Sequence, residues 1–231
     1  MCGRYSLVAT PAEIDDLLGP LQLPLPELRP RYNISPSQSV AIVRVVEGGE
    51  RELALVHWGL IPPWSKDTKT GYSLINARAD GVATKPSFRR AFKKQRCLLP
   101  VTAFYEWQKV ADGPKQPYCI RLRGGALGAF AGLWERWTSE DGATVVDSTT
   151  IVTTVPNDLV SNIHDRMPAV LTREHYATWL DPQEDRAETL LGLLVPYPAM
   201  GMEAYRVSSL VNRPQNEVER CLAPVEQGEL F

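Results

Sequence analysis

Apolar positions along the chain predict mainly short strands. The runs VAIVRVV (40–46) and ELALVHW (52–58) flank the sequence EGGER, which predicts a β-hairpin around a glycine turn. Further apolar or alternating runs have the length and composition of strands, at 97–107, 118–123, 127–137, 148–155 and 204–208.

Helical signals are fewer and more local. TPAEIDDLLGP predicts a helix over 11–18, because Thr10 can cap it, Pro11 suits its first turn and Glu13 completes a capping box. SFRRAFKKQ predicts a second short helix that starts at Ser87. Two more short helices are expected at 156–164 and 172–180, and a longer one at 185–195.

The strands follow one another without regular alternation with helices, which favours an α+β fold over a doubly wound sheet. A length of 231 residues suits one sizeable domain or two small ones, and the chain contains no internal repeat and no low-complexity linker. We therefore expect a single domain over residues 1–231, with residues 213–231 as a polar tail.

Composition and charge narrow the classes of function. The chain is 44% hydrophobic and 23% charged, as in an ordinary globular protein, and charges or prolines interrupt every apolar run before it reaches the length of a membrane span. The formal net charge is −2, so any binding of nucleic acid has to rest on a local arginine patch.

The four cysteines form no CxxC pair and lie at no metal-ligand spacing from a histidine, so no metal site is expected. Cys97 and Cys119 lie in apolar runs and are expected in the core. The first residues contain no export signal, so we expect a reducing, cytoplasmic setting without disulfides.

The opening residues MCGRYSL support two interpretations of Cys2. It is a cysteine in a frayed terminus, or, once Met1 is removed, it is one residue with two nucleophiles, an α-amine and a thiol. The segment by itself leaves both open.

Three segments put polar residues beside apolar strand ends: SLINARAD, VTAFYEWQK and NIHDRMPAVL. In the second, Glu106 is either a surface residue paired with Lys109 or an inward carboxyl whose pKa burial raises, which suits proton transfer. In the third, His164 either binds a carbonyl at a helix end or takes part in chemistry, and Asn76 in the first is by default a turn residue. With Cys2 they form a coherent set of nucleophile, proton carriers and orienting group.

Two tryptophans flank the Pro-Pro turn of HWGLIPPWSK. Trp58 ends an apolar strand and is expected to pack in the core. Trp64 is either packed or exposed, and an exposed tryptophan can stack on unpaired bases while nearby arginines hold phosphates. The basic run FRRAFKKQR is typical of a solvated helix face.

Seven motifs in fixed order are MCGRY, RYNISP, WGLIPPW, INARAD, FYEW, TTVPND and IHDRMPAVL. Together they resemble the SRAP family, the SOS-response-associated peptidase-like, abasic-site processing proteins, from Cys2 to about Asn212. The resemblance implies a mostly antiparallel β pseudo-barrel with short flanking helices and a positively charged cleft. Many members carry two consecutive tryptophans after the proline-rich turn, whereas Ser65 follows Trp64 here, which leaves the preferred DNA sequence or junction open.

The resemblance also implies a function in the DNA damage response: covalent crosslinking to abasic sites in single-stranded DNA through Cys2, by an imine and then a thiazolidine, with strand-cleaving lyase and self-processing peptidase activity besides. No cofactor or metal is implied. We expect a monomer that associates with the nucleoid when it acts on DNA. The residues carried over are catalytic Cys2, Asn76, Glu106 and His164, and DNA-binding Arg4, Asn33, Trp64, Arg78, Thr153 and Arg166.

Two other functions remain open from the sequence. A cysteine or N-terminal-nucleophile peptidase acting on other proteins would use the same Cys2 and His164, but it gives no role to the arginines or to Trp64. A non-catalytic single-strand binding module would bind DNA reversibly, whatever residue stands at position 2.

Overall fold

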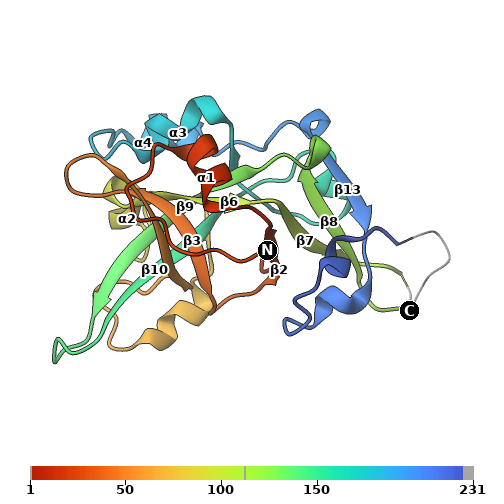
Figure 1. Cartoon of the computed structure of the whole chain (residues 1–231), viewed down its shortest axis with the longest axis horizontal. Coiled ribbons are helices and arrows are strands. Elements are labelled where there is room, and N and C mark those ends of the chain that lie inside the picture. The colour runs from red at the N-terminus through yellow and green to blue at the C-terminus, as the bar shows by residue number, and fades with distance from the viewer. Residues whose placement is uncertain (1, 112, 226–231) are drawn as a thin grey trace.

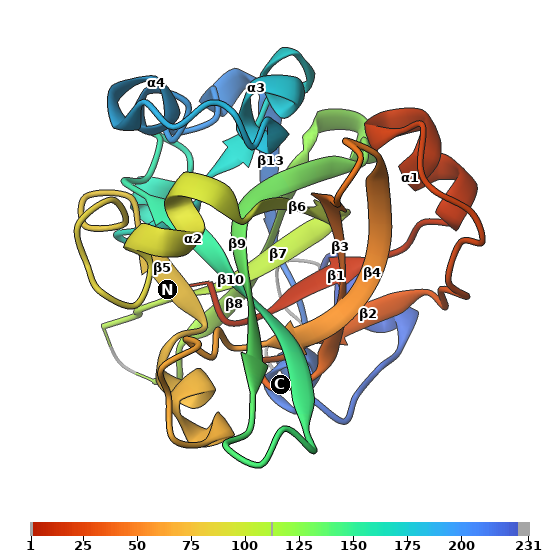
Figure 2. The ribbon, with the colours of Figure 1, turned by 90° about the vertical axis from the view of Figure 1, so that its left-hand side faces the viewer.

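A small closed barrel forms one half of the protein. The computed structural model describes residues 2–111 and 113–225. Within these residues five strands pair in a ring, in the order β10–β4–β3–β6–β9 and back to β10 (Figure 2). All neighbours in the ring are antiparallel except β4 and β10, which are parallel. The ring strands are β3 (Ser39–Val45), β4 (Arg51–Trp58), β6 (Arg96–Val101), β9 (Gly128–Thr138) and β10 (Val145–Thr154).

An open antiparallel sheet forms the other half, in the order β13–β8–β7–β1–β2. Only Thr102 separates β6 from β7, so the chain passes directly from the barrel into this sheet. Figure 1 shows the barrel strands β3 and β9 on one side of the molecule and β7, β8 and β13 on the other. The sheet strands are β1 (Tyr5–Leu7), β2 (Arg31–Ile34), β7 (Ala103–Gln108), β8 (Gln116–Leu122) and β13 (Met202–Arg206).

Three very short strands extend the barrel where the functional residues lie. The first, β5 (Asn76–Arg78), runs parallel to β10, with Ala77 opposite Val152. The second, β11 (Met167–Pro168), pairs with the end of β10, and the third, β12 (Val170–Leu171), pairs with β9. The predicted α+β class, single domain and β-rich barrel are confirmed.

Helix α1 (Pro11–Leu18) forms as its sequence predicts. The Glu13 amide donates to Thr10 Oγ1 over 3.3 Å, and the Thr10 amide donates to Glu13 Oε2 over 2.7 Å, which completes the capping box. Ile14 and Leu18 are the buried residues of this helix, so its amphipathic face anchors it to the core.

The other helices differ from the predictions at their ends. In α2 (Arg89–Lys94) Ser87 is not the cap, because the amides of Phe88 and Arg89 both donate to the Lys85 carbonyl at 2.9 Å. The predicted long helix at 185–195 contracts to α4 (Ala187–Gly192), since the Arg186 amide and guanidinium bind Glu184 in an extended turn. The remaining helices are α3 (Tyr176–Leu180) and 3-10 turns η1 (Thr68–Ser73), η2 (Arg123–Gly125), η3 (Val160–Asn162), η4 (Arg173–His175), η5 (Ala199–Gly201), η6 (Ser209–Asn212) and η7 (Glu219–Leu222).

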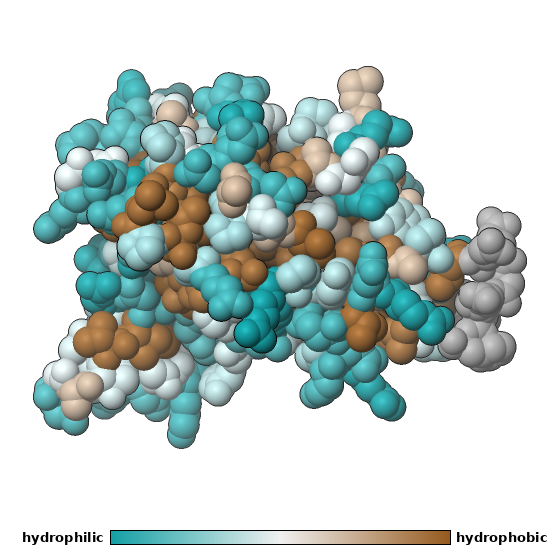
Figure 3. Space-filling model, viewed as in Figure 1, coloured by the Kyte–Doolittle hydropathy of each residue, from teal (hydrophilic) through white to brown (hydrophobic). Residues whose placement is uncertain are grey.

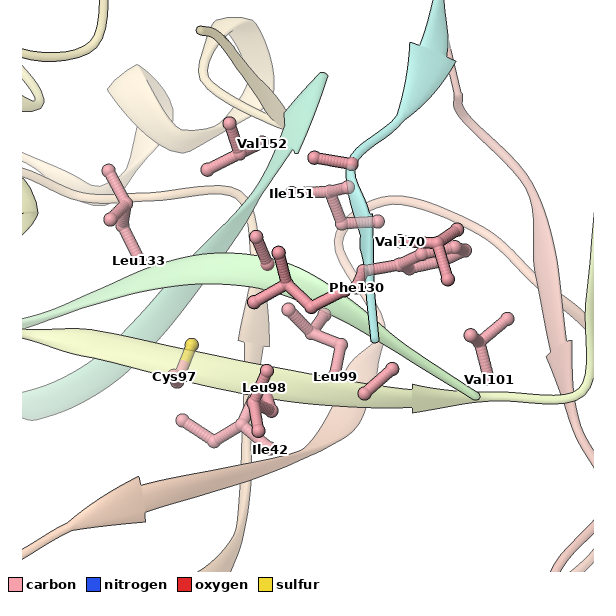
Figure 4. Close-up of a cluster of buried hydrophobic side chains, with 14 of the residues drawn as sticks. Ile42, Cys97, Leu98, Leu99, Val101, Phe130, Leu133, Ile151, Val152 and Val170 are labelled. Atoms are coloured by element: carbon pink, nitrogen blue, oxygen red, sulfur yellow. The ribbon is translucent and has the colours of Figure 1, made fainter. Parts of the chain in front are cut away.

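Aromatic side chains join the barrel to the sheet. Tyr5 of β1 packs edge-on against Trp58 and Phe130, with ring centroids 5.3 and 5.8 Å apart, and Phe104 of β7 packs edge-on against Phe130 at 6.0 Å. Trp58 is fully buried, as predicted. Figure 4 shows Phe130 next to Val170 within the same cluster of buried side chains. Because only Gly3 and Arg4 separate Cys2 from β1, this packing fixes where Cys2 lies.

Residues 208–225, here called the C-terminal strap, fold back onto β2. The Glu217 carboxylate accepts from the backbone amides of Tyr32 and Asn33 and pairs with Arg31 over 2.9 Å. Residues 213–225 therefore belong to the folded unit and not to a projecting tail; residues 226–231 lie outside the described residues.

The face in Figure 3 is mostly hydrophilic, with several separate apolar patches. Among the described residues, no helix has the length and apolar character needed to cross a membrane.

Candidate active site

Cys2 lies buried between the sheet and the barrel. Its side chain is fully buried, and its carbonyl accepts a hydrogen bond from Asn76 Nδ2 over 2.8 Å. Asn76 is the first residue of β5, so the parallel pairing of β5 with β10 presents its amide to the start of the chain. Asn76 Oδ1 is buried and has no hydrogen-bond partner among the described residues. Burial raises the pKa of the Cys2 thiol, and the charge of Glu106 raises it further, so the resting thiol is neutral.

Glu106 points inward and not toward the surface. The residues of β7 from Ala103 to Glu106 are all buried, so both faces of the strand are covered there. Glu106 is only 2% exposed, and burial raises the pKa of its carboxyl to about 7. A carboxyl that titrates near neutral pH can both donate and accept a proton.

His164 follows the η3 turn and faces Glu106. The two side chains approach to 3.7 Å between Nε2 and Oε2. On the other side of the ring, Nδ1 lies 3.0 Å from Asp165 Oδ1 and 3.1 Å from the Arg166 amide nitrogen, which donates to it. Nδ1 also lies 3.2 Å from the Arg166 carbonyl oxygen, so a proton on Nδ1 faces the acceptors Asp165 and Arg166, and a proton on Nε2 faces Glu106. Burial is the main cause that lowers the pKa of His164, so burial favours the neutral form of both partners.

Two arginines, Arg78 and Arg166, contact the end of β10 and lie beside the acid–base centre. Arg166 Nη2 donates to the Thr153 carbonyl over 2.7 Å and to Thr153 Oγ1 over 3.3 Å. Arg78 lies opposite Thr153 in the β5–β10 pairing, and its exposed guanidinium pairs with Asp80 over 2.9 Å. Burial and then the charge of Arg78 lower the pKa of Arg166, as expected for two cations that share one rim. Such a rim suits a bound anion.

Arg4 and Asn33 form a second, more buried group. Arg4 Nη1 donates to Asn33 Oδ1 over 2.8 Å and to the Val211 carbonyl, and its guanidinium lies 5.8 Å from the Trp107 ring. Asn33 is fully buried, and its Nδ2 donates to the carbonyl of Arg213 at 2.9 Å. Asn33 therefore orients Arg4 and holds the C-terminal strap; its contact with DNA stays a prediction.

Trp64 is exposed, but it lines a different groove. Its side chain is 63% exposed and borders a space of about 580 Å³ together with Pro63, Arg89 and Arg90. None of the other predicted site residues lines this groove. Ser65 is buried, and its carbonyl accepts from Trp137 Nε1 over 2.7 Å, which holds the Trp64 turn against the barrel.

Several residues of the site were not predicted from the sequence. Asp165 binds the histidine ring, Trp107 lies beside Arg4, and the strap residue Asn212 accepts from Trp107 Nε1 over 2.7 Å. Asp165 directly follows His164 in the chain, and Trp107 directly follows Glu106. This adjacency to predicted site residues was the signal in the sequence that could have identified them. No group of three or more potential metal ligands is present among the residues that the structure describes.

The fold and the site define a class of α+β proteins in which a closed barrel joins an open sheet. A buried cysteine and carboxyl and a half-buried histidine form an acid–base centre there, next to arginines. Residues 1–214 match the family described as SOS response associated peptidase (SRAP), and the chain belongs to that family. The family predicted from the seven motifs is thereby confirmed.

Related proteins span nearly the whole chain. The abasic site processing protein YoaM of Bacillus subtilis is 43% identical, over 96% of this chain and 97% of its own. The abasic site processing protein HMCES of Pongo abelii is 30% identical, over 98% of this chain and 77% of its own. A crystal structure of a Bacteroides thetaiotaomicron protein has a TM-score of 0.87 at 27% identity, and covers 97% of this chain and 100% of that one.

Proposed function

We propose that this protein processes abasic sites in DNA by forming a covalent crosslink through Cys2 after removal of Met1. The observation that carries the proposal is the set formed by buried Cys2 and Glu106 with half-buried Asn76 and His164. The set is joined by the 2.8 Å hydrogen bond to the Cys2 carbonyl and the 3.7 Å approach of the acid–base pair. The names of the relatives, abasic site processing proteins, support the same substrate.

The first step is condensation of the Cys2 α-amine with the open-chain aldehyde of the abasic deoxyribose. An α-amine has a pKa of about 7.7–8.0, so part of it is unprotonated at neutral pH, unlike lysine at about 10.4. The amine attacks the aldehyde carbon, and loss of one water gives an imine. Intact DNA contains no aldehyde, which makes the reaction specific for the lesion.

The second step is addition of the Cys2 thiol to the imine carbon, which closes a five-membered thiazolidine. The new carbon–sulfur bond forms as the imine nitrogen takes a proton, and the thiol proton leaves through Glu106. Proximity makes this step intramolecular, so it does not require a resting thiolate. This fits a thiol whose pKa burial raises.

The neighbouring residues take distinct roles in this scheme. Asn76 holds residue 2 through its carbonyl, and its buried Oδ1 can accept from the reacting amine. His164 protonates the sugar oxygen during ring opening and exchanges protons with Glu106 across 3.7 Å. Arg78 and Arg166 hold backbone phosphates of single-stranded DNA, to which the protein binds as a monomer.

Lyase and self-processing activities belong to the same proposal. An imine at the former aldehyde carbon acidifies the adjacent carbon, so elimination of the neighbouring phosphate cleaves the strand. The same nucleophile removes Met1 from its own chain. A peptidase acting on other proteins is less well supported, because it gives no role to Arg78 and Arg166, which border the site.

An adduct assay tests the proposal. Single-stranded DNA with one abasic site is incubated with the protein and resolved under denaturing conditions, beside intact DNA and beside DNA with a tetrahydrofuran analogue that lacks the aldehyde. We expect a heat-stable adduct with the abasic site alone. The Cys2→Ala variant retains an α-amine, so borohydride should trap its imine, while unreduced samples show little adduct. A wild-type adduct on the tetrahydrofuran DNA would contradict the proposal.

A further inference from the structure

A cavity of about 470 Å³ opens directly beside the acid–base pair. It lies between the hairpin that joins β7 to β8 and the segment that ends in His164. Its size lies in the range of cavities that hold small ligands. The residues that matter for the argument are Trp107, Lys109, Lys115, Asn162, His164 and Asp165, all of which line it.

The walls of this cavity are held together by hydrogen bonds. Gln108 Nε2 donates to the Asn162 carbonyl over 2.7 Å, and Tyr118 OH donates to Gln108 Oε1 over 3.2 Å. On the adjacent wall, Trp107 Nε1 donates to Asn212 Oδ1 of the C-terminal strap. The hairpin, the η3 segment and the strap are therefore linked without a ligand, so the cavity is preformed.

The charge of the cavity favours an anion. Lys109 and Lys115 stand at the two sides of the hairpin loop and are both exposed. The acidic lining residue is Asp165, whose carboxylate lies 3.0 Å from His164 Nδ1. Lys115 and His164 line the same cavity. Burial is the largest influence on the pKa of Glu106 and of His164, and the charge of Lys115 is a smaller influence on each.

A DNA strand that brings an abasic sugar to Cys2 continues in two directions. Arg78 and Arg166 lie along the end of β10 and account for phosphates on that side only. Across the acid–base pair, the strand meets a cavity with two lysines and an aromatic ring. Lysines act as point charges for phosphates, and aromatic rings accept bases of any sequence by stacking.

We propose that this cavity is a subsite for the nucleotide next to the abasic site, with Lys109 and Lys115 on its phosphodiester and Trp107 against its base or sugar. The inference rests on the proposed function, since it takes an abasic DNA strand as the ligand. It adds two phosphate contacts that the seven motifs do not contain.

Non-covalent binding to single-stranded DNA with one tetrahydrofuran site isolates the subsite, because this DNA cannot crosslink. We expect Lys109→Gln and Lys115→Gln each to weaken binding by about three- to tenfold, and each to reduce the slope of log affinity against log salt by about 0.7. Lys93→Gln, on the exposed face of α2, is the matched control and should leave both quantities unchanged.

Single methylphosphonate linkages, placed in turn on each side of the tetrahydrofuran, locate the contact. On the subsite side, one of these neutral linkages should weaken binding by the wild-type protein most. The same linkage should hardly change the affinity of the doubly substituted Lys109→Gln, Lys115→Gln protein, which already lacks the two charges. Equal affinities and slopes for the lysine variants and Lys93→Gln would overturn the subsite. Adduct formation by the wild-type protein on true abasic DNA is measured in parallel, so failure of the subsite and failure of the proposed function are told apart.

Discussion

Glu106 and His164 are both shifted by burial toward their neutral forms, although their side chains approach to 3.7 Å. A permanent ion pair would hold one proton tightly on the histidine. A neutral pair that titrates near pH 7 can instead release and accept protons during a multistep reaction. This is the electrostatic feature that suits the pair to imine chemistry.

Replacement of Glu106 by glutamine tests that role. The Glu106→Gln protein keeps the shape and hydrogen-bonding capacity of the side chain but cannot exchange a proton. We expect crosslinking to slow by about 10²-fold or more, while affinity for tetrahydrofuran DNA stays near that of the wild type. The rate is measured by quenched time points at saturating abasic DNA. An unaltered rate, with the fold intact by circular dichroism, would remove Glu106 from the mechanism.

The same substitution makes a prediction about stability. The folded pKa of Glu106 lies above its ordinary value of 4.5, so its favourable contribution is present below about pH 4.5 and is lost as pH rises through about 7. The glutamine side chain of the Glu106→Gln variant does not titrate, so relative to the wild type the variant should gain stability between pH 5 and 8, by at most about 3 kcal/mol. Urea unfolding at several pH values checks this. The exposed Glu188→Gln substitution is the control and should show no such trend. If the unfolding free energies of Glu106→Gln and wild type changed with pH in parallel, the prediction would be contradicted.

Residue-level patterns explain why the orientation of Glu106 could not be predicted. A half-buried strand alternates, so a polar residue signals the outer face, but β7 is buried on both faces from Ala103 to Glu106. The surface pairing with Lys109 was equally consistent with the sequence. The family motifs, and not periodicity, singled out the residue.

At the level of elements, helix α1 and the β3–β4 hairpin follow from local sequence because caps and turns act over a few residues. Closure of the barrel does not, since it depends on pairing of His57 with Ser148, far apart in the chain. The short β5 strand has no periodic signal of its own, yet it delivers Asn76 to Cys2.

The contacts of the C-terminal strap with the rest of the fold could not be predicted from the sequence. Its polar composition predicts a tail, but Glu217 accepts two backbone amides of β2, and Val211 accepts from Arg4. The strap therefore helps to fix the position of Arg4, one of the predicted DNA-binding arginines. A chain that ended before it would lose this support.

The Glu217→Ala substitution tests the strap. It removes an ion pair to Arg31 and two amide contacts, so we expect a loss of about 2–3 kcal/mol and a Tm lower by about 4–12 °C. Affinity for tetrahydrofuran DNA should also fall, because the strap that carries the Val211 carbonyl, the acceptor of Arg4, is then held less firmly. Calorimetry and anisotropy measure the two effects. The exposed Glu219→Ala substitution is the control, and equal behaviour of the two variants would argue against the strap.

For the whole molecule, a net charge of −2 means that DNA binding depends on local cations. If Arg4, Arg78 and Arg166 contact phosphates, log affinity for single-stranded DNA should fall with log salt at a slope of about −2, and two subsite lysines bring it to about −3.5. Arg78→Ala or Arg166→Ala should flatten the slope by about 0.7 each. Titrations at several salt concentrations check this, and a slope near zero would exclude binding through these cations.

The central claim is that the terminal cysteine, with its own α-amine, forms the crosslink. Intact-mass measurement of the protein after reaction with abasic single-stranded DNA tests it most directly. The account predicts one adduct whose mass equals the chain without Met1 plus the oligonucleotide, less one water. A variant with a lysine inserted between Met1 and Cys2 keeps the thiol but moves the amine away, and it should give no stable adduct. Full crosslinking by that variant, with its extra residues present in the adduct mass, would contradict the account.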